Sequence, residues 1–262
     1  MTTPDTSTHE PALRRARFVV AYNGAPFHGY AINEGVETVG GVLTNAISTV
    51  TRLDVALEVA GRTDRGVHAR AQVVSCDVPA DTDLGRLLVG VNALCAPHVS
   101  VRSIEWVGED FHARFSAKWR HYKYFVLNTP TPDPMQVDRM WHVREQLSLP
   151  MMQLACDGIM GENDFTSFCR KPNEVVGQPP ASMKRNVMHA QWHDMGEGVF
   201  VFDIRANAFC HQMVRSIVGF MVEVGLHKRK PSDTRAVLLA KDRTLAPNLA
   251  PPHGLFLWEV GY

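Results

Sequence analysis

The sequence predicts an α+β fold made of two similar halves, and two observations support this. Over residues 17–110 the hydrophobic patterns follow the order β-α-β-β-α-β, which is the split βαβ arrangement. Near residue 112 a comparable succession of strand and helix patterns begins again, although no repeat of the sequence itself is visible. We therefore expect a disordered tail over 1–16, one α+β half over 17–110 and a second over 111–262.

The elements of the first half follow from their hydrophobic periods. A β-rich run over 17–24 ends in a turn. Apolar residues then recur at helical spacing on one face, which predicts a helix. These residues are Val39, Val42, Leu43, Ala46, Ile47 and Val50. The remaining expected elements are two strands, a helix and a further strand, at 55–61, 69–78, 83–95 and 99–108.

The second half opens with an alternating strand at 118–128. A helix follows at 147–161, and Pro150 can lie only in its first turn because proline lacks the amide hydrogen that a helix interior needs. The other expected elements are a hairpin, a long helix, a short helix and a closing strand, at 186–195 with 198–207, 209–225, 232–240 and 254–262. Each half is thus predicted to be a ferredoxin-like unit.

The composition is that of an ordinary soluble globular protein, with 45% hydrophobic and 21% charged residues. Lys plus Arg number 27, as do Asp plus Glu, so a polyanion would have to be held by a local basic patch. No apolar run approaches the roughly 20 residues that cross a bilayer, and residues 1–17 lack the apolar core of a secretion signal. The five cysteines are widely spaced, which argues against a disulfide framework and a zinc–thiolate site. We expect a reduced, cytoplasmic protein with no membrane partner.

The loop Gly61–Gly66, with the sequence GRTDRG, places one carboxylate between two arginines. Its terminal glycines permit positive φ and a close approach by another molecule. The nearby cations at Arg62, Arg65 and His68 would keep the Asp64 carboxylate ionised, which suits a nucleophile or a charge stabiliser. For the loop alone, a wide hairpin loop with a solvated Asp–Arg contact is the commoner interpretation.

Residues 112–125 interleave aromatic with basic residues and contain no acid. The basic residues suit phosphate contacts, and the aromatic rings offer faces for an unstacked base. These basic residues are Arg114, Lys118, Arg120 and Lys123. A strand places Arg120, Tyr122 and Tyr124 on one face and Lys123 on the other, so only one set can line a site. An edge strand with a solvated cationic face explains the segment alone equally well.

The predicted helix from Phe209 carries a core stripe on one face and the pair His211 and Arg215 on another. An arginine on a mostly apolar helix is more often a surface residue whose head group reaches water. Further candidates for phosphate contacts are Lys184, Arg185 and the basic cluster at 228–230, for which a solvated turn is the commoner interpretation.

No metal site and no cofactor are expected. His189 and His193 lie in a segment, HAQWH, whose alternation predicts a strand. Residues four apart on a strand are about 13 Å from each other, which we take as too far for a shared zinc ion. Neither a Walker loop nor a dinucleotide-binding glycine pattern is present.

Four motifs, GRTDRGVHA, DFHARFSA, GENDFTSF and NAFCHQMVRSIVG, resemble the tRNA pseudouridine synthase A family in both content and order. The resemblance runs from about residue 17 to the C-terminus. It implies a cofactor-free isomerase that acts as a homodimer on uridines of the anticodon stem-loop of tRNA. It also implies a pseudouridine synthase fold, in which two halves flank a central cleft.

By the same resemblance, Asp64 matches the catalytic aspartate of the family and Arg62 a partner that steadies it. Tyr122 matches the tyrosine that packs on the target base, and it is also a candidate base for the last proton. Arg215 matches the arginine that forms a salt bridge with the aspartate. The four basic residues of 112–125 would contact the RNA backbone.

The sequence departs from the family pattern at Asn23, which stands for an acid, and at Tyr30-Ala31, which stand for tryptophan and glutamine. Arg65 also replaces a small residue after the aspartate. A synthase with a different RNA substrate is therefore one alternative. A non-catalytic RNA-binding or tRNA-chaperoning relative, which would not need Asp64, is another. A glycoside hydrolase ranks lower, because that chemistry commonly uses two carboxylates and the loop supplies one.

Overall fold

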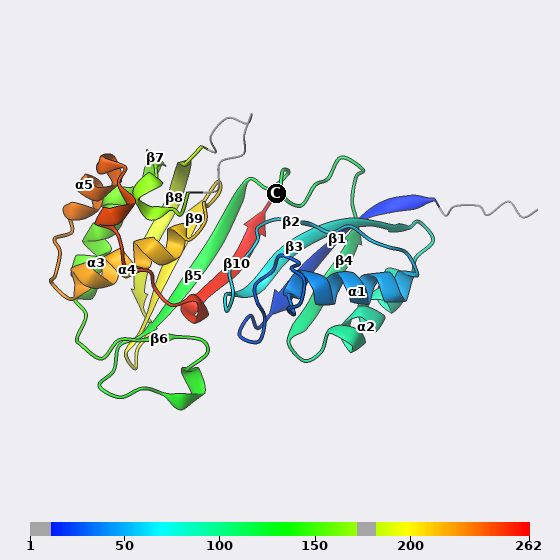
Figure 1. Cartoon of the computed structure of the whole chain (residues 1–262), viewed down its shortest axis with the longest axis horizontal. Coiled ribbons are helices and arrows are strands. Elements are labelled where there is room, and N and C mark those ends of the chain that lie inside the picture. The colour runs from blue at the N-terminus through cyan, green and yellow to red at the C-terminus, as the bar shows by residue number, and fades with distance from the viewer. Residues whose placement is uncertain (1–11, 172–181) are drawn as a thin grey trace, which may run out of the picture.

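The computed structural model describes residues 12–171 and 182–262, and one mixed sheet runs through this part of the chain (Figure 1). Its strands are β1 (Leu13–Tyr22), β2 (Glu58–Val59), β3 (His68–Pro79), β4 (Val99–Trp106), β5 (Trp119–Leu127), β6 (Trp141–His142), β7 (Gly161–Asp164), β8 (Lys184–Asp194), β9 (Val199–Ala206) and β10 (Leu255–Gly261). The strand order is β4-β1-β3-β10-β5-β9-β8-β7, while β2 pairs with β3 and β6 pairs with β5.

The helices cover this sheet in two groups. They are α1 (Val39–Thr51), α2 (Leu84–Cys95), α3 (Leu149–Cys156), α4 (Met213–Gly225) and α5 (Asp233–Ala240). α1 and α2 lie beside the N-terminal strands, and α3, α4 and α5 gather at the other end of the sheet (Figure 1). The predicted α+β class is confirmed. Among the described helices none is both long and apolar enough to cross a bilayer.

Local sequence explains where these helices begin. The Thr38 hydroxyl accepts a hydrogen bond from the Gly41 amide at 3.1 Å, which caps the first turn of α1. The Asp83 carboxylate does the same for α2 by accepting from the amides of residues 85 and 86. Pro150 lies in the first turn of α3, as predicted. Each cap satisfies amides that have no partner within the helix.

Two sets of strands share one pairing pattern. In the first, β1 is antiparallel to both β3 and β4, and β2 is antiparallel to β3 on its other edge. In the second, β5 is antiparallel to both β9 and β10, and β8 is antiparallel to β9. The orders are therefore β4-β1-β3-β2 and β10-β5-β9-β8. A short parallel pairing between β10 and β3, at Phe256 with His68 and Leu257 with Ala69, joins the two sets.

Several boundaries differ from the sequence predictions. β1 begins at Leu13, so the expected tail over 1–16 is too long; residues 1–11 lie outside the described residues. Ala16 is fully buried and the Arg15 side chain pairs with Asp77, which holds this part of the chain in the sheet. The strand expected at 55–61 is only the two-residue β2.

The long helix predicted from Phe209 begins only at Met213. The reason is Gln212, whose φ of 65° and ψ of 5° lie in the left-handed region and cannot continue a right-handed helix backwards. Residues 211 and 212 therefore form a turn that leads into α4, and this turn carries His211.

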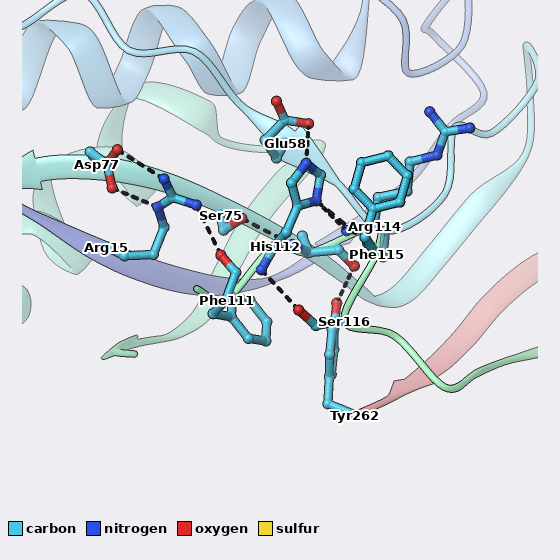
Figure 2. A network of polar contacts seen from close by, with 12 residues as sticks. Arg15, Glu58, Ser75, Asp77, Phe111, His112, Arg114, Phe115, Ser116 and Tyr262 are labelled. Carbon is cyan, nitrogen blue, oxygen red and sulfur yellow. Dashed lines mark hydrogen bonds and ion pairs between the residues drawn. The ribbon is translucent and has the colours of Figure 1, made fainter. Parts of the chain in front are cut away.

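The segment Phe111–Ser116 joins β4 to β5 and is tightly anchored (Figure 2). The Ala113 amide donates to the Ser75 hydroxyl at 3.1 Å, and the Tyr262 hydroxyl donates to the Ala113 carbonyl at 2.7 Å. Arg15 donates to the Phe111 carbonyl at 2.9 Å. The motif DFHARFSA is thus held in place by Arg15 of β1, Ser75 of β3 and Tyr262, the residue that follows β10.

Candidate active site

Asp64 lies in the loop between β2 and β3, and two side chains from the distant end of the chain converge on it. Arg215, in the first turn of α4, donates from Nη1 to Asp64 Oδ2 at 3.1 Å. His211 Nε2 lies 3.3 Å from Asp64 Oδ1. Each carboxylate oxygen thus has its own partner, and the partners come from a segment about 150 residues further along the chain.

This carboxylate borders a pocket of about 560 Å³, a volume within the range of small-molecule sites. The residues that line it are Ala25, Asp64, Arg65, Gly66, Asp138, His211, Gln212, Arg215, Pro252 and His253. They come from the loop after β1, the loop that carries Asp64, the connection before β6, the start of α4 and the turn before β10. The Asp64 side chain is 28% exposed, so it is accessible to a ligand in the pocket.

The Arg215 guanidinium is held in a fixed orientation. Its Nε donates to the Ala250 carbonyl at 2.8 Å, and the Ala250 amide donates to the Arg215 carbonyl at 3.1 Å. The segment at 248–250 approaches α4 closely because Gly219 has no side chain: a Cβ there would lie 2.5 Å from the Asn248 carbonyl oxygen. The sequence of α4 thus positions the cation that contacts Asp64.

The loop that carries Asp64 is held in place by hydrogen bonds from buried polar groups. The Gln72 side chain donates to the Gly61 carbonyl at 2.6 Å, and the hydroxyls of Tyr22 and Thr63 are 2.8 Å apart. Arg120 donates from Nη2 to the Ala60 carbonyl at 2.9 Å. Because a buried polar group without a partner is costly, these contacts specify one loop conformation.

Tyr122 lies beneath this loop on the buried face of β5, with its hydroxyl next to Gly61. Its ring packs edge-to-face on Phe209 at 5.0 Å between centroids. Burial, with a smaller contribution from neighbouring charges that include Asp64, raises the pKa of Tyr122 well above its ordinary value. The phenol is therefore protonated at neutral pH and could accept another proton only after releasing its own.

Comparison with known proteins shows the family of the chain. A family model described as tRNA pseudouridine synthase matches residues 155–262. A tRNA pseudouridine synthase A of Brevibacillus brevis is 37% identical over 250 residues, which cover 95% of this chain and 100% of that protein. The chain belongs to the tRNA pseudouridine synthase A family. Relatives of the same name from Aliivibrio salmonicida and Bacillus licheniformis are 38% and 35% identical, each over 95% of this chain and over 92% and 99% of their own.

Among solved structures, a Cbf5-Nop10-Gar1 complex matches 79% of this chain and 45% of its own, with 13% identity and a TM-score of 0.35. Such a score is too low to argue a shared fold.

In this member of the family, two residues expected beside Asp64 lie elsewhere. Arg62 is exposed, and within the described residues no hydrogen bond or ion pair joins it to the Asp64 carboxylate. His68 is buried and points away: its Nδ1 accepts from the Gly24 amide at 3.0 Å, and its Nε2 donates to the Asp138 carbonyl at 2.8 Å. Burial lowers the pKa of His68, so the prediction that it acts as a nearby cation is wrong.

Arg120 also differs from its prediction as a phosphate ligand. Its residue is only 9% exposed, and its guanidinium donates to the carbonyls of Ala60, Arg114, Ala117 and Asn207. With its donors directed at backbone oxygens, it has none facing RNA. The alternation that placed it on the same face as Tyr122 is confirmed, but this face is the buried one.

The other basic candidates divide by exposure. Arg114, Lys118 and Lys184 are exposed and accessible to phosphate. Lys123 lies on the face of β5 opposite Tyr122, 3.4 Å from the Asp203 carboxylate and 4.6 Å from the Trp258 ring centroid. Its position removes it from the pocket of Asp64. Arg185 donates to the carbonyls of its neighbours at 182 and 184, and in the 228–230 cluster Arg229 pairs with Glu223.

His189 and His193 are closer than the strand spacing suggested. One ligand atom of each, together with one of Asp203, lies within 4.8 Å of the others. The imidazole side chains of the two histidines can approach each other although their Cα atoms are far apart. The argument that distance excludes a shared ion is therefore wrong. Asp203 already faces His121 Nε2 at 2.6 Å and Lys123 at 3.4 Å. Burial alone would raise its pKa, but these partners outweigh burial and lower it.

The cysteines also differ in part from the prediction, because Cys169 and Cys210 form a disulfide across 41 residues. Wide spacing in the sequence did not prevent this, since the two segments lie side by side. Cys76, Cys95 and Cys156 are free and buried. The bridge ties the residue before His211 to the segment after β7.

Four polar residues of the pocket were missed or left unassigned: Asp138, His211, Gln212 and His253. The sequence held a signal for one of them, because His211 precedes Arg215 by four residues in the motif NAFCHQMVRSIVG. Asp138 lies in a turn and His253 in a single turn of 3-10 helix, and neither period nor motif marks them in the sequence. Only the folded chain brings them to the pocket.

Proposed function

We propose that this tRNA pseudouridine synthase isomerises uridine to pseudouridine in the anticodon stem-loop of tRNA, with Asp64 as the catalytic carboxylate. The observation that carries the proposal is the convergence of Arg215 and His211 on Asp64 beside a pocket of about 560 Å³. We further propose the cytoplasm as its compartment. We also propose a homodimer as its working form, and sedimentation of the purified protein would test this oligomeric state.

The reaction needs no redox partner. The N1–C1′ glycosidic bond breaks, the uracil turns within the pocket, and a C5–C1′ bond forms; C5 loses a proton and N1 gains one. Asp64 acts at C1′, either by direct attack or by assisting an elimination at the sugar. Arg215, oriented through Ala250, stabilises the carboxylate charge without reorganising during the step.

The target base must leave its stack to reach Asp64, which costs a few kcal/mol for a paired base and less for one in a loop. We propose that Tyr122 packs on that base from beneath Gly61; the residue is 8% exposed and is not among the residues that line the pocket, and its ring forms a T-shaped pair with Phe209. As a neutral phenol it adds no charge that would oppose the Asp64 carboxylate. Arg62, Arg114 and Lys118 are proposed contacts for the RNA outside the pocket.

We assign the chain to two ferredoxin-like halves that flank this pocket, the first ending near residue 110 and beginning at Leu13. The assignment is supported by the orders β4-β1-β3-β2 and β10-β5-β9-β8, in which each central pair is antiparallel. Asp64 follows β2 of the first set and Arg215 lies in α4 of the second, so the pocket needs both.

The decisive experiment maps pseudouridines in total cellular RNA with and without the protein. We expect uridines of the anticodon stem-loop to remain unmodified in its absence, and sites missing instead from another RNA would establish a different substrate. The variant Asp64→Asn should lose isomerisation by at least about a thousandfold while keeping tRNA affinity within a factor of about three. A non-catalytic RNA-binding or chaperoning protein would lose neither property.

Product analysis separates the isomerase from a glycoside hydrolase. Asp138 also lines the pocket, so counting the carboxylates of the loop alone does not exclude two acting together. A hydrolase would release free uracil and leave an abasic ribose. We expect no free uracil, and its appearance in step with loss of uridine would refute isomerisation.

A further inference from the structure

A second pocket, which we call the basic pocket, adjoins the one that holds Asp64. Its volume is about 460 Å³, and Gln212 lines both pockets. The two pockets therefore lie on either side of this residue. The lining residues that matter for its chemistry are Arg170, Lys171, Gln212, Lys241, Asp242 and Arg243.

The rim of the basic pocket is connected directly to the catalytic groups. The Arg170 amide donates to the His211 carbonyl at 3.0 Å, and the His211 side chain lies 3.3 Å from Asp64. The disulfide between Cys169 and Cys210 crosses the same junction. Residue 170 is thus placed one backbone hydrogen bond from a partner of the proposed catalytic carboxylate.

The residue shared by the two pockets has an unusual backbone. Gln212 has a φ of 65°, a region that non-glycine residues rarely adopt and that costs on the order of 1 kcal/mol. Its carbonyl nevertheless accepts from the Ser216 amide at 2.9 Å, which starts α4. Residues held in such conformations concentrate at binding and catalytic sites, because the surroundings impose them.

The charge of the basic pocket favours an anion. Four of its lining side chains are cationic, and the single acid is Asp242. The Asp242 carboxylate accepts from the amide and hydroxyl of Thr244 at 2.9 and 2.8 Å, and Lys241 pairs with Asp164 at 3.3 Å. Arg170 and Lys171 are exposed, and among the described residues neither forms an ion pair. Their charges are the ones available to a ligand.

The walls of this pocket are held in place by buried and partly buried hydrogen bonds. The Ser167 hydroxyl donates to the Val237 carbonyl at 2.6 Å and accepts from the Asp242 amide at 2.9 Å. Arg243 donates to the Ser216 hydroxyl of α4 at 3.0 Å. The wall formed by residues 167, 242 and 243 is therefore in place before a ligand arrives, which reduces the entropy lost on binding.

We propose that the basic pocket binds the phosphodiester backbone of the nucleotide next to the target uridine, with Arg170 and Lys171 as phosphate ligands. This inference rests on the proposed function. A base that turns out of its stack displaces its own backbone, so the adjoining phosphates must be held beside the catalytic pocket. Guanidinium and ammonium groups hold phosphates without reading base sequence. Arg170 and Lys171 would thus position tRNA without touching the reacting atoms.

The first test measures tRNA affinity and the single-turnover rate of isomerisation for Arg170→Gln/Lys171→Gln. We expect the dissociation constant for tRNA to rise at least about tenfold and the rate at saturating enzyme to change less than about threefold. The slope of log K against log[salt] should become smaller in magnitude by between about 1 and 2, because two phosphate contacts are lost. The charge-preserving variant Arg170→Lys/Lys171→Arg should stay within about threefold of wild type. Arg86→Gln/Arg102→Gln, which neutralises two exposed cations of α2 and β4, should also bind normally.

The second test locates the contact. Full-length tRNA carrying one uncharged methylphosphonate next to the target uridine should bind wild type about tenfold more weakly than normal tRNA, whereas the Arg170→Gln/Lys171→Gln variant should not distinguish the two. The proposal would be overturned if the methylphosphonate weakened binding to the Arg170→Gln/Lys171→Gln variant as much as it weakens binding to wild type. It would also be overturned if the Arg86→Gln/Arg102→Gln control lost as much tRNA affinity as that variant. A further outcome is that wild type makes no pseudouridine while the methylphosphonate still weakens binding to wild type and not to the Arg170→Gln/Lys171→Gln variant. In that case the proposed function would fail and the phosphate site would stand.

Discussion

At the scale of single residues, the site depends on how Arg215 and His211 share the carboxylate of Asp64. Arg215 is 12% exposed, and it bonds both Asp64 and the Ala250 carbonyl. His211 is 46% exposed and lies 3.3 Å from the other carboxylate oxygen. Since solvent screens exposed pairs far more than buried ones, Arg215 should dominate the stabilisation of this carboxylate.

The first prediction follows from this difference. Arg215→Gln should lower the single-turnover rate by about 10²–10³, because it removes a fixed charge from a partly buried carboxylate. His211→Gln should lower it by only about tenfold. Arg215→Lys keeps the charge but loses the fork that reaches both Asp64 and Ala250, and it should fall between the two. Equal effects at 211 and 215 would contradict this ranking.

At the scale of elements, the loop that carries Asp64 is positioned by β5, a strand that it does not adjoin in the sequence. Arg120 of β5 donates to the Ala60 carbonyl at 2.9 Å and to the Arg114 carbonyl at 2.6 Å. It therefore links the loop to the connection between β4 and β5. The same side chain that resembles a phosphate ligand in the sequence is a clamp in the fold.

We accordingly predict that Arg120→Gln destabilises the protein by about 2–4 kcal/mol, because several buried carbonyls lose their charged donor. Urea unfolding followed by circular dichroism measures this. Arg114→Gln is the matched control, since Arg114 is exposed and should change stability by less than about 0.5 kcal/mol. A smaller loss at position 120 than at 114 would rule out the clamp.

The first residue of β3 makes a second link between elements. His68 accepts from the Gly24 amide and donates to the Asp138 carbonyl, so it joins two segments that border the pocket. This arrangement requires the neutral ring, because a proton on Nδ1 would face an amide donor. Burial lowers the pKa of His68, and it also lowers that of His253 nearby.

Stability should therefore fall on the acid side of neutrality. In the unfolded chain the pKa of His68 is about 6.5, whereas in the folded chain its pKa is lower. His68 thus contributes stability that is complete above about pH 6.5 and is lost as pH falls from there toward its folded pKa. Melting temperatures between pH 8 and pH 5 should show this decline. His68→Gln should reduce its slope, and an unchanged slope would contradict the argument.

At the scale of the whole molecule, a single sheet carries both sets of strands. The parallel pairing of β10 with β3 joins them, and Arg215 of one set contacts Asp64 of the other. The C-terminal strand thus returns to the middle of the sheet, between β3 and β5. Neither set can move without disturbing the pocket.

We predict that the chain unfolds in one cooperative transition. Far-UV circular dichroism and tryptophan fluorescence should give coincident urea curves, because Trp106 lies in β4 and Trp258 in β10, on either side of the junction. Truncation after Gly254 removes β10 and should abolish this coincidence. Two separate transitions in the intact protein would show that the sets fold independently.

The sequence by itself did not reveal the short strands β6 and β7, but it determined the class of fold, the order of the longer elements, the family and the loop that carries Asp64. Each of these depends on local periods or contiguous motifs, which survive without knowledge of tertiary contacts. The alternation of β5 likewise identified the face that carries Arg120 and Tyr122. It could not say whether this face was buried or exposed.

Only the tertiary structure decided which charges meet. It brought His211 and Arg215 to Asp64, left Arg62 without contact to that carboxylate among the described residues, and turned Arg120 inward. It also joined Cys169 to Cys210 and opened the basic pocket beside Gln212. These outcomes depend on pairings between segments that lie far apart in the chain, and a side chain's partners depend on distances that no local pattern encodes.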